Sequence, residues 1–176
     1  MKISAIATLM LLSLSLLGQS PGKRQVEIGL LLDVRNSEVE PLIGRLKNEI
    51  IAVVGEDAEV ILNENAILVN DFNLDKAEQN YQQIIAGNSD IILAFGAINN
   101  VVVSKQNTHA KPTILFGSVP GDFAELDKTR SSSGIPNLAY LITSQSYLSD
   151  LETFSQLHDY KTVGIAIEKP VEETWR

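Results

Sequence analysis

The feature that most constrains the fold is a short, wholly apolar run at residues 91–95 (IILAF), followed at once by Gly96 and a helix-like segment. Because the run has no polar alternation, it predicts a strand covered on both faces, as in a parallel sheet between layers of helices. Gly96 permits a sharp turn, and a helix that begins there points its free backbone N–H groups over the strand's carboxyl end. Ligands bind at that edge of open parallel sheets, so the run predicts a binding domain.

Apolar runs and amphipathic segments alternate along the rest of the chain. We expect strands at residues 26–32, 58–62, 113–116, 138–142 and 161–167, with residues 63–71 and 117–121 as connections. We expect a helix capped by Ser37 and Glu40 and ended by Gly55, helices at residues 74–86 and 98–106, and a helix after Ser144 or Ser146. This alternation predicts an α/β fold with a parallel open sheet and helices on both faces.

The first 20 residues differ from everything after them. Lys2, an apolar stretch over residues 3–17 and small or polar residues at 18–20 are typical of a secretory signal peptide. The stretch is shorter than the roughly 20 apolar residues that a membrane span needs. We therefore expect residues 1–20 to be cleaved, a periplasmic or secreted location, and no stable membrane insertion of the mature chain.

Composition excludes several classes of function. The net charge of -8 without a basic block argues against nucleic acid, and zero cysteines exclude thiolate metal sites and a lipid-modified cysteine. His109 and His158 have no neighbours at metal-ligand spacing, so we expect no metal. Without a G-x-G-x-x-G or Walker A sequence, we also expect no nucleotide cofactor.

Three loops follow strands and should meet at one edge of the sheet: DVRNS at 33–37, FGAIN at 95–99 and FGSVPGD at 116–122. We expect the backbone N–H groups of residues 97–99 to bind a ligand carboxylate there. If the φ of Gly96 is negative, Gly96→Val should block the approach of the ligand at a limited cost in stability. An equally open interpretation of Asp33 is that it satisfies loop N–H groups. The candidate ligand-binding residues are Asp33, Asn36, Gly96, Ala97, Asn99, Ser118 and Val119.

The chain resembles the ABC-transporter substrate-binding proteins of the periplasmic binding protein type I fold, in the subgroup that includes aromatic amino-acid binders. The resemblance lies in VEIGLLLD, in LDKAEQNYQQIIAGNSDIILAFGAI, in KPTILFGSVPGDFAEL and in GIPNLAYLITSQSYLSDLETFSQLHDYKTVGIAIE. It implies two α/β lobes, a small solute enclosed between them, and delivery to a membrane permease. The chain departs from the family pattern in having Gly96, Ala97 and Ile98 where hydroxyl residues are common, and Pro120 to Asp122 in place of Asp-Pro.

The resemblance also implies how the chain is divided. Residues 21–143 correspond to the first lobe, and residues 144–176 to a helix and strand that begin a second lobe and are then truncated. We expect such a chain to bind solute weakly and to self-associate through the strand at 162–167 and Trp175.

Two other functions remain open. One is a cytoplasmic-type ligand-sensing domain of the same fold, although residues 1–20 resemble a signal peptide where a DNA-binding segment would be needed. The other is a secreted hydrolase that uses Ser118, Asp122 and a histidine, but sequence order does not identify a catalytic triad. We expect a binding protein and not an enzyme.

Overall fold

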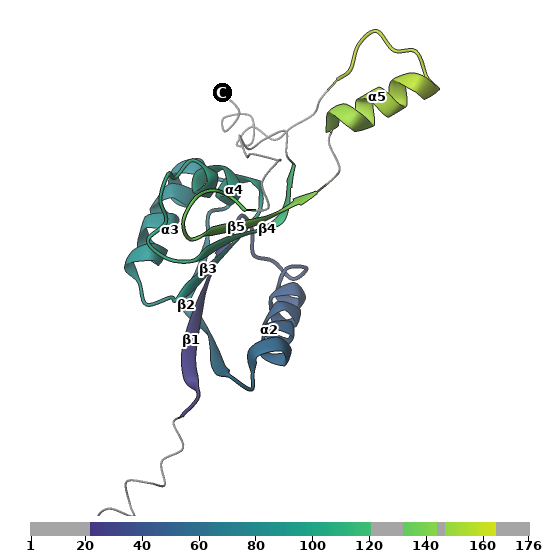
Figure 1. The fold of residues 1–176 in the computed structure, drawn as a ribbon. Helices are drawn as coiled ribbons and strands as arrows, with labels where there is room; N and C mark the ends of the chain where they lie inside the picture. The colour runs from purple at the N-terminus through teal and green to yellow at the C-terminus, as the bar shows by residue number, and fades with distance from the viewer. Residues whose placement is uncertain (1–21, 121–131, 144–146, 165–176) are drawn as a thin grey trace, which may run out of the picture.

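The computed structural model describes residues 22–120, 132–143 and 147–164, so the predicted signal peptide and Trp175 lie outside the described residues. Figure 1 shows a twisted sheet with helices on both sides. The elements, in chain order, are β1 (Arg24–Leu32), α2 (Glu40–Val54), β2 (Ala58–Val69), α3 (Leu74–Ala86), β3 (Ile91–Phe95), α4 (Ala97–Ser104), β4 (Thr113–Pro120), β5 (Leu138–Thr143) and α5 (Tyr147–Leu157).

The five strands form one sheet in the order β2-β1-β3-β4-β5, and every pair is parallel. The predicted α/β fold with an open parallel sheet is therefore confirmed, and this strand order is one of the common doubly wound arrangements. β3, which carries the apolar run, lies at the centre of the sheet between β1 and β4. Its carboxyl end consequently has neighbouring strand ends on both sides.

Helices cover both faces of the sheet, and each face has its own apolar core. On one face α3 and α4 pack through Tyr81, Ile84 and Val102 onto inward residues such as Leu31 and Ile92. On the other face α2 packs on the sheet through Ile43. The core residues of this second face are Ile28, Leu30, Leu32, Ile43, Ile67 and Leu93. Alternate residues of β1 thus belong to opposite cores, as expected for a strand covered on both sides.

The predicted end of the second strand at Leu62 is wrong, because β2 continues to Val69. Residues 63–65 are exposed and form an irregularity, with Ile28 paired to Leu62 but Leu30 paired to Ile67. Four residues of β2 therefore stand opposite the single Gly29. The polar stretch does not end the strand, since the apolar run at residues 66–69 resumes the pairing with β1.

The predicted turn at residues 117–121 is also wrong over its first four residues, because β4 runs on to Pro120. A second irregularity lies here, with Leu115 paired to Tyr140 and Val119 paired to Ile142. β5 supplies backbone partners on the outer side of β4, and these keep the Gly-Ser-Val-Pro segment extended.

Most helix ends agree with the sequence, but one cap does not. Asn73 caps α3 by accepting from the backbone N–H of Lys76, and Gly55 and Gly87 end α2 and α3 as predicted. The predicted Ser37 cap is wrong: α2 begins at Glu40, and the side chain of Asn36 accepts from the N–H groups of Glu38 and Val39 at 2.9 and 3.0 Å. An asparagine that folds its own loop has taken the place of a capping box.

α5 stands apart from the sheet in Figure 1. Its predicted apolar face is not buried by the described residues, since Phe154 is 52% and Leu157 is 80% exposed. Residues 161–164 form no strand, so the prediction of a last strand from residue 161 is wrong over that part, and residues 165–167 lie outside the described residues. Within the described chain, no helix has both the length and the apolar character needed to cross a membrane.

Candidate functional site

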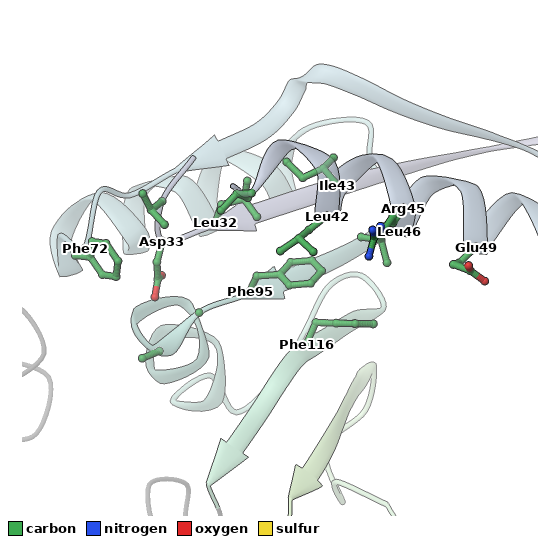
Figure 2. Close-up of a pocket in the computed structure, with 14 residues that line it drawn as sticks. Leu32, Asp33, Leu42, Ile43, Arg45, Leu46, Glu49, Phe72, Phe95 and Phe116 are labelled. Atoms are coloured by element: carbon green, nitrogen blue, oxygen red, sulfur yellow. The ribbon is translucent and has the colours of Figure 1, made fainter. Parts of the chain in front are cut away.

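An open pocket lies between α2 and the carboxyl ends of the central strands (Figure 2). Its volume is about 720 Å³, which is within the range of small-molecule sites. Most of its lining is apolar and comes from five segments: the end of β1, α2, the segment after β2, the end of β3 and the middle of β4. The lining residues are Leu32, Asp33, Val34, Val39, Leu42, Ile43, Arg45, Leu46, Glu49, Phe72, Phe95, Gly96, Ala97 and Phe116.

One wall of the pocket is a face of α2, and the facing surface includes an aromatic pair. Val39, Leu42, Ile43 and Leu46 recur at helical spacing, which places them on the side of α2 that faces the sheet. Phe95 and Phe116 are register partners on β3 and β4, and their ring centroids lie 4.9 Å apart. Leu42 is 59% exposed although it lines the pocket, so the pocket is open to solvent on this side.

Asp33 is buried at one end of the pocket and accepts four hydrogen bonds. Its Oδ1 accepts from Asn70 Nδ2 at 2.8 Å, from Asn99 Nδ2 at 2.9 Å and from the Asn99 backbone N–H at 3.1 Å. Its Oδ2 accepts from the Ile98 backbone N–H at 2.9 Å. Asn70 and Asn99 are 0% and 1% exposed. The carboxylate therefore ties β1, the segment after β2 and the start of α4 into one rigid cluster.

This cluster changes the expected role of the α4 N-terminus. The backbone N–H groups of Ile98 and Asn99, which the sequence assigned to a ligand carboxylate, donate to Asp33. An anion from the protein itself thus already interacts with the positive end of the helix. Asp33 does satisfy backbone N–H groups, but all described donors to its carboxylate belong to Asn70, Ile98 and Asn99, and none belongs to the loop at 33–37.

Gly96 has the backbone geometry that only glycine adopts readily. Its φ is +98°, so the condition attached to the Gly96→Val prediction, a negative φ, is not met. A Cβ at this position would overlap the carboxyl group of Asp33. The limited cost in stability expected for a negative φ therefore does not apply, because any side chain here would be strained and would displace Asp33.

The structure brings part of the predicted set of site residues together. Asp33, Gly96 and Ala97 line the pocket, and Asn99 lies behind them, bonded to Asp33 and to the Phe95 carbonyl. Asn36 is exposed in the loop before α2, where its side chain holds the turn and does not line the pocket. Ser118 and Val119 lie within β4, but their side chains are outside what the structure describes.

Sequence reasoning missed Asn70, Phe72 and the pocket face of α2. A signal for Asn70 was present, because AILVN at residues 66–70 repeats the pattern of GLLLD at residues 29–33, an apolar run that ends in a polar residue. Asn70 also accepts from the Phe72 backbone N–H at 2.7 Å. Asp71 and Phe72 have φ values of +54° and +58°, which a bulky side chain rarely adopts, so tertiary contacts hold this turn.

An ion-pair network fixes the loop beside the pocket. The Arg35 guanidinium pairs with Glu40 at the start of α2 and, at 2.8 Å, with Glu64 in the irregular part of β2. The hydrogen bonds that Arg35 donates to the two carboxylates raise the pKa of Arg35, and the same interaction lowers the pKa of Glu64. The pairs are exposed and contribute little stability, but they join the loop after β1 to the start of α2 and to β2.

The buried histidine lies at the other end of the sheet. His109 precedes β4, its Nδ1 lies 2.7 Å from the Tyr81 hydroxyl, and burial lowers its pKa. Ser118 is near the carboxyl end of β4, so the structure does not bring His109 and Ser118 together, and Asp122 lies outside the described residues. Among the described residues, no group of three His, Asp or Glu side chains could hold a metal ion.

Comparisons of the chain with known protein families, with curated proteins and with solved structures found no match.

Proposed function

We propose that this chain is the solute-binding lobe of an extracytoplasmic component of an ABC-type transport system. The observation that carries the proposal is the open apolar pocket at the carboxyl edge of the parallel sheet, the edge at which ligands bind in such folds. The pocket combines a large apolar surface with a few fixed polar groups, which is the usual composition of a small-molecule site. The resemblance to substrate-binding proteins supports a solute as the ligand and a membrane permease as the partner.

The architecture of the site favours binding over catalysis. Asp33 is held by four hydrogen bonds from neutral donors, which suits a group that shapes a site and not one that exchanges a proton in each turnover. The side chains that form most of the pocket, such as Leu42, Phe95 and Phe116, have no acid, base or nucleophile. They can supply contact area and exclude water, and that is what retention of a solute requires.

The test is a ligand screen with two matched variants on one helix. Ligand-observed NMR would be used to titrate the chain with amino acids, aromatic amines, alcohols and acids, and we expect at least one class to bind. Leu42→Gln should weaken that binding because Leu42 lines the pocket. Val53→Gln should leave it unchanged, because Val53 is 81% exposed on the same helix and does not line the pocket. Absence of binding across the screen, or equal losses in both variants, would contradict the proposal.

The transport role has its own measurement. Expression of the chain in a bacterium with two membranes, followed by fractionation and mass spectrometry of the N-terminus, should place a product that lacks about 20 residues in the periplasm. Recovery of the intact N-terminus in the cytoplasm would favour the ligand-sensing alternative.

A further inference from the structure

We infer that the pocket selects solutes that join a flat apolar body to a positively charged amino group, and that it discriminates against the same body carrying a carboxylate. The inference rests on the proposed function and names the ligand class of that site. It runs against the expectation that a ligand carboxylate would bind the α4 N-terminus.

The first step concerns the donors that would recognise a carboxylate. Of the backbone N–H groups of residues 97–99 that the sequence assigned to a ligand carboxylate, those of Ile98 and Asn99 donate to Asp33, as does the side-chain amide of Asn99. To reach these donors, a ligand carboxylate would have to displace Asp33, and the buried protein carboxylate would then keep a single partner, Asn70. Such an exchange is unfavourable because an unpaired buried charge is costly.

The second step concerns the charge at this end of the pocket. All four described hydrogen bonds to the Asp33 carboxylate come from neutral N–H groups, and none of the described ion pairs includes this carboxylate. The carboxylate therefore brings a negative charge to the pocket without a counter-ion among the described residues. A ligand anion would be repelled, and a ligand cation would be attracted.

The third step concerns acceptor capacity. A carboxylate offers about four acceptor positions, two on each oxygen. Among the described residues, Oδ2 of Asp33 accepts from Ile98 and from no other donor, and Oδ2 lies beside Gly96, which also lines the pocket. One acceptor position on Oδ2 therefore has no donor among the described residues, and our inference assigns it to a donor on the ligand. An ammonium group, with three N–H donors, is the group that matches it.

The fourth step concerns the rest of the ligand. Phe72 lies near Asp33 at this end of the pocket, and the Phe95–Phe116 pair faces α2 beyond it (Figure 2). Aromatic side chains contact flat apolar groups well, and they also attract cations. Arg45 and Glu49 lie farther along α2, where both are exposed and carry opposite charges, so their fields are screened and largely cancel. The net electrostatic preference of the pocket is therefore set by Asp33.

The test uses three probes with one ring and different charges: 2-phenylethylamine, 2-phenylethanol and 3-phenylpropionate. In ligand-observed NMR titrations of the full chain at low salt, we expect the amine to bind roughly tenfold or more tightly than the acid, with the alcohol between them. The ratio of the amine affinity to the acid affinity should fall when salt is added, because the preference is electrostatic. Asp33→Asn, checked for folding by circular dichroism, should bring the affinities of amine and acid close together.

The outcomes separate the ligand class from the function. If the acid binds as tightly as the amine or more tightly, the ligand class is wrong and the pocket remains a binding site. If none of the three probes binds and Leu42→Gln alters the binding of no other solute, both the inference and the proposed function are overturned. The wild-type affinities decide the matter even if Asp33→Asn does not fold.

Discussion

Asp33 is the residue on which the geometry of the candidate site depends. Its carboxylate joins segments that follow three different strands, and it does so through Asn70, Ile98 and Asn99. Charge-assisted hydrogen bonds of this kind are stronger than neutral ones. The residue therefore organises the edge of the sheet before any solute arrives.

The positive φ of Gly96 leads to a stability prediction. Gly96→Ala should lower the free energy of unfolding by at least about 2 kcal/mol, because the backbone becomes strained and the new Cβ overlaps Asp33. Gly44→Ala is the matched control. Gly44 lies within α2 with nothing within 4 Å of an added Cβ, so alanine should stabilise by roughly 0.5–1 kcal/mol. Urea unfolding of both variants measures the difference, and equal effects would refute the role assigned to Gly96.

His109 predicts how stability depends on pH. Burial lowers its pKa from the ordinary value of 6.5, so the folded state favours the neutral ring. The contribution of His109 to the free energy of unfolding is fully present above about pH 6.5 and is lost as the pH falls below that value. For one proton, the free energy of unfolding changes by at most about 1.4 kcal/mol per pH unit.

Urea unfolding at pH 7.5 and pH 5.5 would measure this dependence. His109→Gln should flatten it, whereas His158→Gln should not, because His158 is exposed at the end of α5. An unchanged pH dependence in His109→Gln would show that other groups cause the loss.

At the scale of elements, Asn36 and Ser37 are alternative candidates for the side chain that stabilises the start of α2. Asn36→Ala should cost about 1 kcal/mol, because its side chain accepts from two backbone N–H groups before the helix. Ser37→Ala should have almost no effect on the free energy of unfolding, since no side-chain hydrogen bond caps α2. Thermal melts would measure both variants. A larger loss of stability in Ser37→Ala than in Asn36→Ala would instead support the capping box that the spacing of Ser37 and Glu40 indicates.

The elements show which parts of the fold the sequence could reveal. β1, β3 and α3 were predictable because each combines an apolar pattern with a clear end signal, such as Asn73 and Gly87 around α3. The predicted ranges of β2 and β4 are too short, because polar and glycine residues usually mark turns. In the structure, pairing with neighbouring strands keeps those residues extended. That support comes from tertiary structure and is absent from the local sequence.

The candidate site was predictable in its place but not in its internal contacts. The carboxyl edge and the residues Asp33, Gly96 and Ala97 followed from the strand ends. The bond between Asp33 and the amides of α4 joins residues 65 and 66 positions apart, so no local pattern could indicate it. The φ of Gly96 likewise depends on that contact.

At the scale of the whole molecule, the two faces of the sheet are covered unequally. Among the described helices, α3 and α4 cover one face and α2 covers the other, where Leu42 remains 59% exposed. Phe154 and Leu157 add exposed apolar surface on α5. Exposed apolar surface of this kind promotes association between proteins.

We therefore expect the purified chain to self-associate as its concentration rises. Sedimentation velocity should show larger species for the parent chain and fewer of them for the double variant Phe154→Ser, Leu157→Ser. Val53→Ser is the control. Val53 is 81% exposed, much as Leu157 is 80% exposed, but it lies on α2 and does not line the pocket. A single monomeric species at every concentration would contradict this expectation.

The hydrogen bonds of Asp33 also have a kinetic consequence. Because the start of α4 is already satisfied by a group of the protein, a solute that enters the pocket does not have to order the edge of the sheet or wait for a rare conformation. Association should then proceed at nearly the same rate for solutes of similar size and equal charge. Differences in affinity among such solutes would arise from how long each one stays, so residence time, and not the speed of capture, would determine which of them the pocket retains.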